Sequence, residues 1–244
     1  MRMGVGILVV TGIAASALWA QPPAFEVASV KPNHTGGYPR TYPRLQNGTF
    51  TAEIASLKTL IVVAYGLIEL RINGPDWLDT EKYDIIAKAP EGVPDSQIMP
   101  LLQSLLKDRF HLENHFETKE MPAYDMVVSK GGAKLKPFDP AHPPEPPRNR
   151  GQAVMMGVGT TTQIADALAR AAGRPVVDKT GMAEEGRFGW TVNYTPFSAN
   201  DSSASAAPDL FAAIEQQLGL KLESRKESVQ ILVIDHVERV PSEN

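Results

Sequence analysis

Two carboxylates and an aromatic ring stand close together in the first half of the chain, and these are residue types that glycan chemistry uses. Asp76, Trp77 and Asp79 directly follow the turn at Gly74-Pro75. Paired carboxylates can carry out acid–base hydrolysis, and a carboxylate beside an aromatic ring can bind a sugar. The alternative interpretation is a turn with a buried tryptophan and two solvated carboxylates.

The second half of the chain places three charged side chains at the equivalent turn. Arg174, Asp178 and Lys179 stand before Gly181, and the run DKTG predicts a β-turn in which the glycine takes a positive φ. A contact surface between the two halves, near Trp77 and this turn, would bring both sets of side chains together. We therefore predict a ligand- or partner-binding surface at these six side chains and assign no catalytic residue.

Two histidine patterns do not meet the requirements of the sites they suggest. His111 and His115 form H-x-E-x-H, whereas a zinc-binding helix needs H-E-x-x-H with the glutamate beside the metal. The segment predicts a strand, in which residues four apart lie about 13 Å from each other, too far to share one ion. Asp235 and His236 have no nucleophile in a G-x-S-x-G turn with which to form a triad. The sequence therefore predicts no metal and no cofactor.

Composition excludes several classes of protein. The chain of 244 residues is 43% hydrophobic and 21% charged, which is ordinary for a globular protein with a real core. It has no cysteine, so disulfides, thiolate nucleophiles and cysteine-ligated metal centres are excluded. The net charge is -4 and the sequence has no concentrated basic track, so we expect no nucleic-acid partner. The sequence has no phosphate loop or dinucleotide fingerprint.

The first 20 residues have the pattern of a signal peptide. Arg2 supplies a positive start, residues 4–19 are apolar over about the length of an h-region, and small residues precede Gln21. We predict cleavage after Ala20 and a mature protein that is periplasmic or extracellular. The alternative is an uncleaved membrane anchor, although the stretch is short for a bilayer of about 30 Å. After cleavage we expect no stable membrane span.

Two low-complexity stretches divide the mature chain. Residues 137–151 are proline-rich and predict an extended linker, and residues 196–208 are small and polar and predict a loop. We therefore predict a first α+β module over residues 21–136 and a second over residues 152–244.

The two predicted modules show the same order of elements. Alternating apolar residues predict strands, and apolar residues three and four apart predict helices. The predicted segments of the first half are strands at 25–31, 48–54, 70–72 and 83–89, helices after Ser56 and from Ile98, and a closing hairpin of 111–118 with 123–129. Those of the second half are strands at 153–158, 176–177 and 187–194, helices after Thr160 and Asp209, and a closing hairpin of 221–225 with 229–237.

This order predicts an α+β fold of two tandem β-α-β-β-α-β-β modules, with helices packed on mainly antiparallel sheets. Leu112-Glu113 corresponds to Leu222-Glu223, and the flanking elements keep nearly the same spacing. An internal duplication explains this offset, and a chance likeness of two ordinary α/β patterns is the alternative.

Six motifs, taken together, cover nearly the whole mature chain. They are FEVASVKPN (25–33), GPDWLDTEKYDIIAKAP (74–90), LLKDRFHLENHFETKEMPAY (105–124), GGAKLK (131–136), RPVVDKTGM (174–182) and QQLGLKLESRKESVQILVIDHVERVPSEN (216–244). With these motifs the chain resembles the soil-associated family of exported proteins, which is greatly expanded in acidobacteria and has no established function. The resemblance implies export and no known active site. Similar domains joined to membrane metallopeptidases of the antibiotic-sensor type imply a role in sensing or protein contact.

These observations predict an exported, non-enzymatic binding or protein-interaction protein whose partner is an unknown envelope protein or peptide. The missing catalytic patterns, and sheet edges that can accept a partner strand, favour this function. Two alternatives stay open: a secreted hydrolase acting on glycans or peptides, and an extracytoplasmic sensor domain that partners a membrane protein. A hydrolase requires a pocket with convergent carboxylates or histidines.

Overall fold

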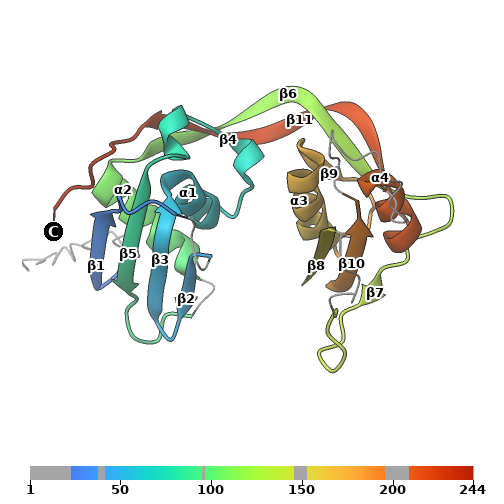
Figure 1. The fold of residues 1–244 in the computed structure, drawn as a ribbon, viewed down its shortest axis with the longest axis horizontal. Helices are drawn as coiled ribbons and strands as arrows, with labels where there is room; N and C mark the ends of the chain where they lie inside the picture. The colour runs from blue at the N-terminus through green and yellow to red at the C-terminus, as the bar shows by residue number, and fades with distance from the viewer. Residues whose placement is uncertain (1–22, 38–41, 95–96, 146–152, 196–208, 244) are drawn as a thin grey trace, which may run out of the picture.

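The chain folds as two lobes joined by a long two-stranded ribbon, and together they form an arch (Figure 1). This computed structural model describes residues 23–37, 42–94, 97–145, 153–195 and 209–243. The predicted signal peptide, residues 146–151 of the predicted linker and the predicted loop at 196–208 lie outside the described residues. The described part is α+β, as predicted, with four α-helices and several sheets. None of its helices is long and apolar enough to cross a membrane.

The first lobe is a four-stranded antiparallel sheet with two helices on one face. Its strands, in sheet order, are β1 (Val27–Pro32), β5 (Lys82–Lys88), β3 (Thr49–Ser56) and β2 (Arg44–Gln46). The helices are α1 (Leu57–Tyr65) and α2 (Ile98–Phe110). They pack on the face that carries Phe50, Ile85 and Ala87, whereas Ile86 on the other face is 62% exposed. This contrast between neighbours follows from the two-residue repeat of a strand.

The second lobe is a three-stranded antiparallel sheet that also carries helices. Its strands, in sheet order, are β7 (Lys136–Pro137), β10 (Phe188–Tyr194) and β8 (Ala153–Gly159). Its helices are α3 (Thr161–Ala172) and α4 (Leu210–Ala213), and α4 continues as a π-helical turn, η4 (Ile214–Leu218). Trp190 and Val192 of β10 share a core with Ile164 and Leu168 of α3. Because Pro137 pairs in this sheet, the proline-rich segment begins inside the second lobe.

Polar caps and left-handed residues fix where the central helices begin and end. The Ser56 side chain accepts a hydrogen bond from the N–H of Thr59 at the start of α1. Thr160 and Gln163 form a reciprocal capping box at the start of α3. Gly66 and Gly173 end these helices with φ of 61° and 67°, a conformation that glycine adopts without steric cost. Both helices are therefore confirmed where the sequence predicts them.

The ribbon consists of β6 (Glu113–Val128) and β11 (Leu220–His236), which pair antiparallel along their whole lengths. The two predicted closing hairpins are therefore wrong, because each pair of predicted strands is one continuous strand. Alternation identifies strand residues, but it carries no information about which strand is the partner. Residues 119–122 also lack the Gly or Asn that favours a tight hairpin turn, and they lie in the middle of β6.

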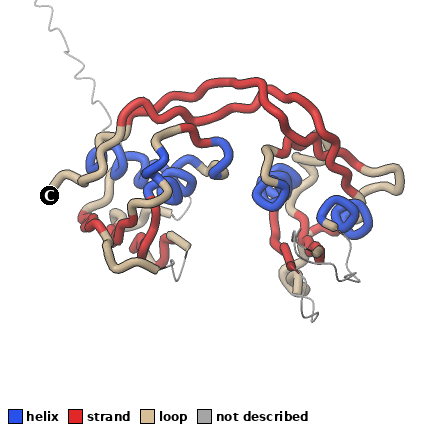
Figure 2. Tube along the Cα trace, turned by 45° about the horizontal axis from the view of Figure 1, so that its top comes forward, coloured by secondary structure: helices blue, strands red, loops and turns tan. Residues whose placement is uncertain are grey.

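Each half of the chain supplies a strand to the lobe that the other half builds. Leu232 and Ile234 of β11 are buried in the core of the first lobe, and Met126 of β6 is buried in that of the second. Figure 2 shows both strands running from one lobe to the other. Two short strands join them in parallel: β4 (Ile72–Asn73) pairs with β11, and β9 (Val176–Asp178) pairs with β6. The cores therefore do not follow the predicted division at residues 137–151.

A disulfide across the ribbon tests this exchange of strands. Thr118 lies opposite Gln230, and the N–H of Tyr124 points away from β11 to the carbonyl of Pro175. Even-numbered residues of β6 therefore occupy non-hydrogen-bonded positions, where paired Cα atoms lie about 4.5 Å apart. We expect Thr118→Cys/Gln230→Cys to form a disulfide in high yield in this otherwise cysteine-free chain. After cleavage at a protease site inserted at 146–152, the halves should migrate as one band on a non-reducing gel.

The matched control is Thr118→Cys/Ala123→Cys. A closed hairpin would bring these two residues opposite each other, whereas in one strand they lie roughly 17 Å apart. Cross-linking of the control pair, with none in the Thr118–Gln230 pair, would contradict the continuous ribbon.

Candidate functional site

The three predicted site residues of the first lobe do not converge on a pocket. Trp77 packs against the core of its own lobe, and the Arg239 guanidinium lies 5.2 Å from the centre of its ring. The carboxylate of Asp79 forms an ion pair of 2.9 Å with Lys58. Asp76 is exposed. The hydrolase alternative requires convergent carboxylates, and these contacts do not favour it.

The three predicted residues of the second lobe attach the turn at 174–181 to its surroundings. The Arg174 guanidinium lies 5.6 Å from the ring centre of Tyr124 on β6. Lys179 Nζ lies 3.4 Å from the carboxylate of Glu227 on β11. Asp178 is held against the start of α3. Within the described part of the chain, no hydrogen bond, ion pair or ring contact joins this set to the first, and their common binding surface stays a prediction.

The carboxylate of Asp178 is occupied by hydrogen bonds from its own lobe. It accepts from the N–H of Thr180 at 3.0 Å, from the Thr180 hydroxyl at 2.7 Å and from the Thr162 hydroxyl at 3.3 Å. Burial would raise the pKa of Asp178, but the nearby Thr161 hydroxyl and the hydrogen bonds from Thr180 and Thr162 outweigh burial and lower that pKa. Because Thr161 and Thr162 begin α3, the helix dipole also favours the charged carboxylate there.

His111 and His115 lie beside carboxylates at the surface. His115 Nδ1 lies 2.8 Å from the Asp235 carboxylate, and His111 Nδ1 lies 3.3 Å from that of Glu238. His111 ends α2 in the left-handed conformation with φ 49°, so the H-x-E-x-H run begins at a helix cap and continues along β6. Within the described residues, no group of three or more His, Asp or Glu side chains could hold a metal ion.

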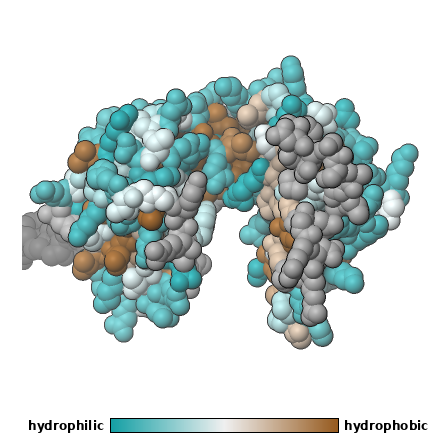
Figure 3. Space-filling view, viewed as in Figure 1, coloured by the Kyte–Doolittle hydropathy of each residue, from teal (hydrophilic) through white to brown (hydrophobic). Residues whose placement is uncertain are grey.

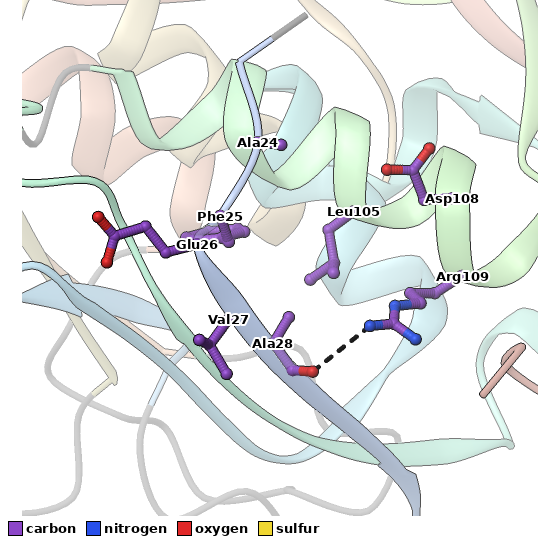
Figure 4. A pocket seen from close by; sticks show the side chains of 8 residues that line it. All are labelled: Ala24, Phe25, Glu26, Val27, Ala28, Leu105, Asp108 and Arg109. Atoms are coloured by element: carbon purple, nitrogen blue, oxygen red, sulfur yellow. Dashed lines mark hydrogen bonds between the residues drawn. The ribbon is translucent and has the colours of Figure 1, made fainter. Parts of the chain in front are cut away.

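A cavity of about 310 Å³ lies between the N-terminal strand and α2 (Figure 4). Arg109 reaches from α2 to the carbonyl of Ala28 on β1 at 3.5 Å, and it also donates to the carbonyl of Ser242 at 3.2 Å. One guanidinium therefore holds both ends of the described chain against α2. Arg109 therefore has a structural role at this cavity.

The two lobes contact each other just below the ribbon. Beyond this contact an open hollow separates them (Figure 3). The contact is made by the 3₁₀ turn η1 (Glu69–Arg71) and by α3. Ile68, just before this turn, is 1% exposed and belongs to the core of the second lobe. Arg71 lies 3.4 Å from Asp166, and Arg170 lies 3.2 Å from Glu69. The buried side chain of Ile68, which we call the plug, and two ion pairs therefore attach the first lobe to the second.

Two cavities follow α3 from this contact and share the side chain of Arg170. The first, of about 310 Å³, is lined by Tyr42, Val62, Val63, Gly66, Leu67, Ile68, Gln163, Asp166 and Arg170. The second, of about 540 Å³, is lined by Val154, Met155, Met156, Ala167, Arg170, Ala171, Trp190 and Tyr194. We call the two cavities together the α3 groove.

The α3 groove is mainly apolar and has one accessible cation. The pKa of Asp166 is raised, because the effect of burial is larger than the opposing effect of the nearby Arg71 and Arg170. Burial and the Glu69 carboxylate raise the pKa of Tyr42, so its phenol is neutral at pH 7. The side chain of Arg170 is 47% exposed and carries the positive charge of the lining.

A family described as "Protein of unknown function (DUF3738)" matches residues 58–237. The chain belongs to this family. The matched region holds most of both lobes, the whole ribbon and every lining residue of the α3 groove except Tyr42. No curated protein and no solved structure matches the chain. The function of this DUF3738 member must therefore be argued from its own geometry.

The sequence gives no signal that singles out the groove. Arg170 lies on the polar side of a predicted amphipathic helix, where a solvated arginine is ordinary. Tyr42 and Ile68 lie between predicted elements, far in sequence from α3. Only the fold brings these residues together.

Replacing Asp178 by Asn tests its structural role through pH. The pKa of Asp178 is lower in the folded state than in the unfolded state. Its stabilisation of the fold is therefore complete above the unfolded pKa of about 3.9, and this stabilisation is lost as the pH falls through the folded pKa. We expect Asp178→Asn to lower the free energy of unfolding by roughly 1–2 kcal/mol at pH 7. The difference from the parent protein should shrink below about pH 4. A pH-independent difference in urea titrations would contradict this assignment.

Truncating Ile68 tests the plug between the lobes. Because this side chain is buried in the second lobe, we expect Ile68→Ala to reduce the free energy of unfolding by about 2–4 kcal/mol and to speed amide exchange around η1. Ile86→Ala removes the same atoms from an exposed site and should change stability little. Equal effects of the two substitutions in denaturant titrations would rule out the plug.

Proposed function

We propose that this chain is an exported, non-enzymatic binding protein, built by internal duplication, which holds a polypeptide segment of an envelope partner in the α3 groove. The observation that carries the proposal is the groove itself. It is more apolar than polar and has a single accessible guanidinium, and its smaller cavity lies where the two lobes meet. Ligand sites in proteins favour such junctions and this mixture of apolar walls with few polar groups.

Matched positions in the two lobes support the duplication. Pro32 lies opposite Tyr83 in the first sheet, and Pro137 lies opposite the aromatic Phe188 in the second. The N-caps of α1 and α3, Ser56 and Thr160, each come one residue after the partner of that aromatic residue in the sheet. The parallel strands β4 and β9 join the ribbon in the same way. Two β-α-β-β-α-β-β modules that opened their closing hairpins and exchanged the strands would produce this fold.

The chemistry of the groove favours a polypeptide as its occupant. Met155 and Met156 offer flexible apolar contacts that adapt to different side chains, and Trp190 and Tyr194 add aromatic surface. Two cavities of about 540 and 310 Å³ that adjoin at Arg170 have room for a segment of several residues. Glu69, 3.2 Å from Arg170, already places one carboxylate on this guanidinium. The occupant is therefore an extended apolar segment with an acidic side chain that meets Arg170.

Peptide binding tests the proposed function. The probe is a set of synthetic 12-residue peptides of alternating Leu and Val with one central Glu, and the reporter is Trp190 fluorescence in a Trp77→Phe background. We expect Arg170→Gln to weaken binding at least tenfold, because the peptide carboxylate loses a charged hydrogen bond. Glu69→Gln should strengthen binding, since Glu69 competes for the same guanidinium.

Arg44→Gln, on an exposed residue of β2, is the matched control and should bind like the parent protein. Equal affinity for peptides with Glu and with Gln at the centre, or no response of Trp190 to any peptide, would overturn the proposal.

A further inference from the structure

A fourth cavity lies on the second lobe, beside β7. Its volume is about 570 Å³. Its lining combines aromatic and proline rings with charged and hydrogen-bonding groups, among them Lys136, Phe138, Asp139, His142 and Pro144. We call this cavity the β7 pocket. Arg170 and the other residues of the interlobe contact do not line it.

One wall of the β7 pocket is fixed by packing against β10. The N–H of Phe138 donates to the carbonyl of Arg187 at 2.8 Å, and the Arg187 guanidinium lies 5.8 Å from the Phe138 ring centre. Pro144 packs on Gly189, where a Cβ atom would lie only 3.1 Å from its ring. A side chain at Gly189 would therefore force this wall to move. The rings of Phe138 and Pro144 are held in place without a ligand.

The opposite wall is the π-helical turn η4. The Gln217 amide pairs with the backbone of Asn193, accepting from its N–H at 3.0 Å and donating to its carbonyl at 2.8 Å. Lys134 is tied to the same turn, because its Nζ donates to the carbonyl of Gln216 at 2.7 Å. The corresponding helix of the first lobe, α2, is regular and has no such turn. Short π-helical segments occur often at functional sites.

The charges around the pocket favour an anion that also carries hydroxyl groups. Lys136 and His142 are exposed, and His142 Nδ1 lies 2.7 Å from the Asp139 carboxylate. Hydrogen bonds from His142 and from the N–H of Ala141 lower the pKa of Asp139, so this carboxylate is charged at pH 7. Because Nδ1 is held, the Nε2 atom of His142 is left as the free nitrogen of the ring. The carboxylate of Asp139 keeps lone pairs that can accept hydroxyl groups.

We infer that the β7 pocket binds an acidic saccharide. The apolar C–H face of a sugar ring packs against Phe138 and Pro144, its hydroxyl groups donate to Asp139 and to the Nε2 atom of His142, and its carboxylate meets Lys136. A volume of about 570 Å³ suits an oligosaccharide of a few rings. Trp190 is the one residue that lines both this pocket and the proposed peptide groove, and the site can exist without the groove.

Titration calorimetry of the mature chain tests the inference with three probes: trigalacturonate, the neutral galactotriose and inorganic phosphate. We expect trigalacturonate to bind and the other two to bind at least tenfold more weakly. Lys136→Glu should weaken trigalacturonate binding at least tenfold. The matched control is Lys31→Glu, which changes the lysine at the corresponding position of β1 in the first lobe, and it should bind like the parent protein.

Arg170→Gln should leave trigalacturonate binding unchanged, because Arg170 does not line the β7 pocket. The peptide proposal and the saccharide proposal can therefore be overturned independently. Thermal unfolding of each variant identifies loss of fold, and His142→Gln offers a second, milder change at an exposed residue. Equal binding of galactotriose or of phosphate, or equal weakening by Lys31→Glu and Lys136→Glu, would overturn the inference.

Discussion

The antiparallel pairing of β6 with β11 is the constraint on which the rest of the molecule depends. A backbone ladder alone leaves the register open, so side chains at its two ends must set it. Leu232 and Ile234 enter one core, whereas Leu222 and Met126 enter the other. A slip of one residue would turn all of these side chains to the opposite face. The two cores thus fix the register from both ends, and the ribbon in turn sets how far apart the lobes stand.

Among the described residues, no third strand pairs with the middle of the ribbon formed by β6 and β11. An exposed pair of strand edges invites pairing with other chains, and natural proteins discourage this with proline and charge. The nitrogen of Pro122 faces the same edge as the N–H of Tyr124, away from β11, so the missing donor costs no bond in the ladder. Glu120 and Lys226 add charge nearby. A small buried cluster of Ala123, Val229 and Ile231 gives this stretch a core of its own.

Local signals in the sequence were sufficient for the helices and insufficient for strand pairing and for the groove. The Ser56 and Gly66 signals predict α1 correctly because capping depends only on neighbouring residues. The hairpins were wrong because a strand does not encode its partner. The carboxylate of Asp178 accepts hydrogen bonds at the first turn of α3 and in the following turn, and a polar residue at a turn has the same sequence pattern whether it supports the fold or binds a ligand. No sequence motif marks Arg170, because its proposed role depends on its position beside Glu69, which lies across the contact between the lobes.

The exchange of strands also sets the order in which the molecule can be completed. The first lobe is the first to be synthesised, but its core lacks Leu232 and Ile234 until nearly the whole chain has been made. Native contacts between residues so far apart in sequence slow folding, because a long loop must close before the contacts form. The core of the first lobe therefore stays incomplete until β11 has been synthesised. That is the state in which a polypeptide can be threaded through a translocation channel, as the proposed export requires.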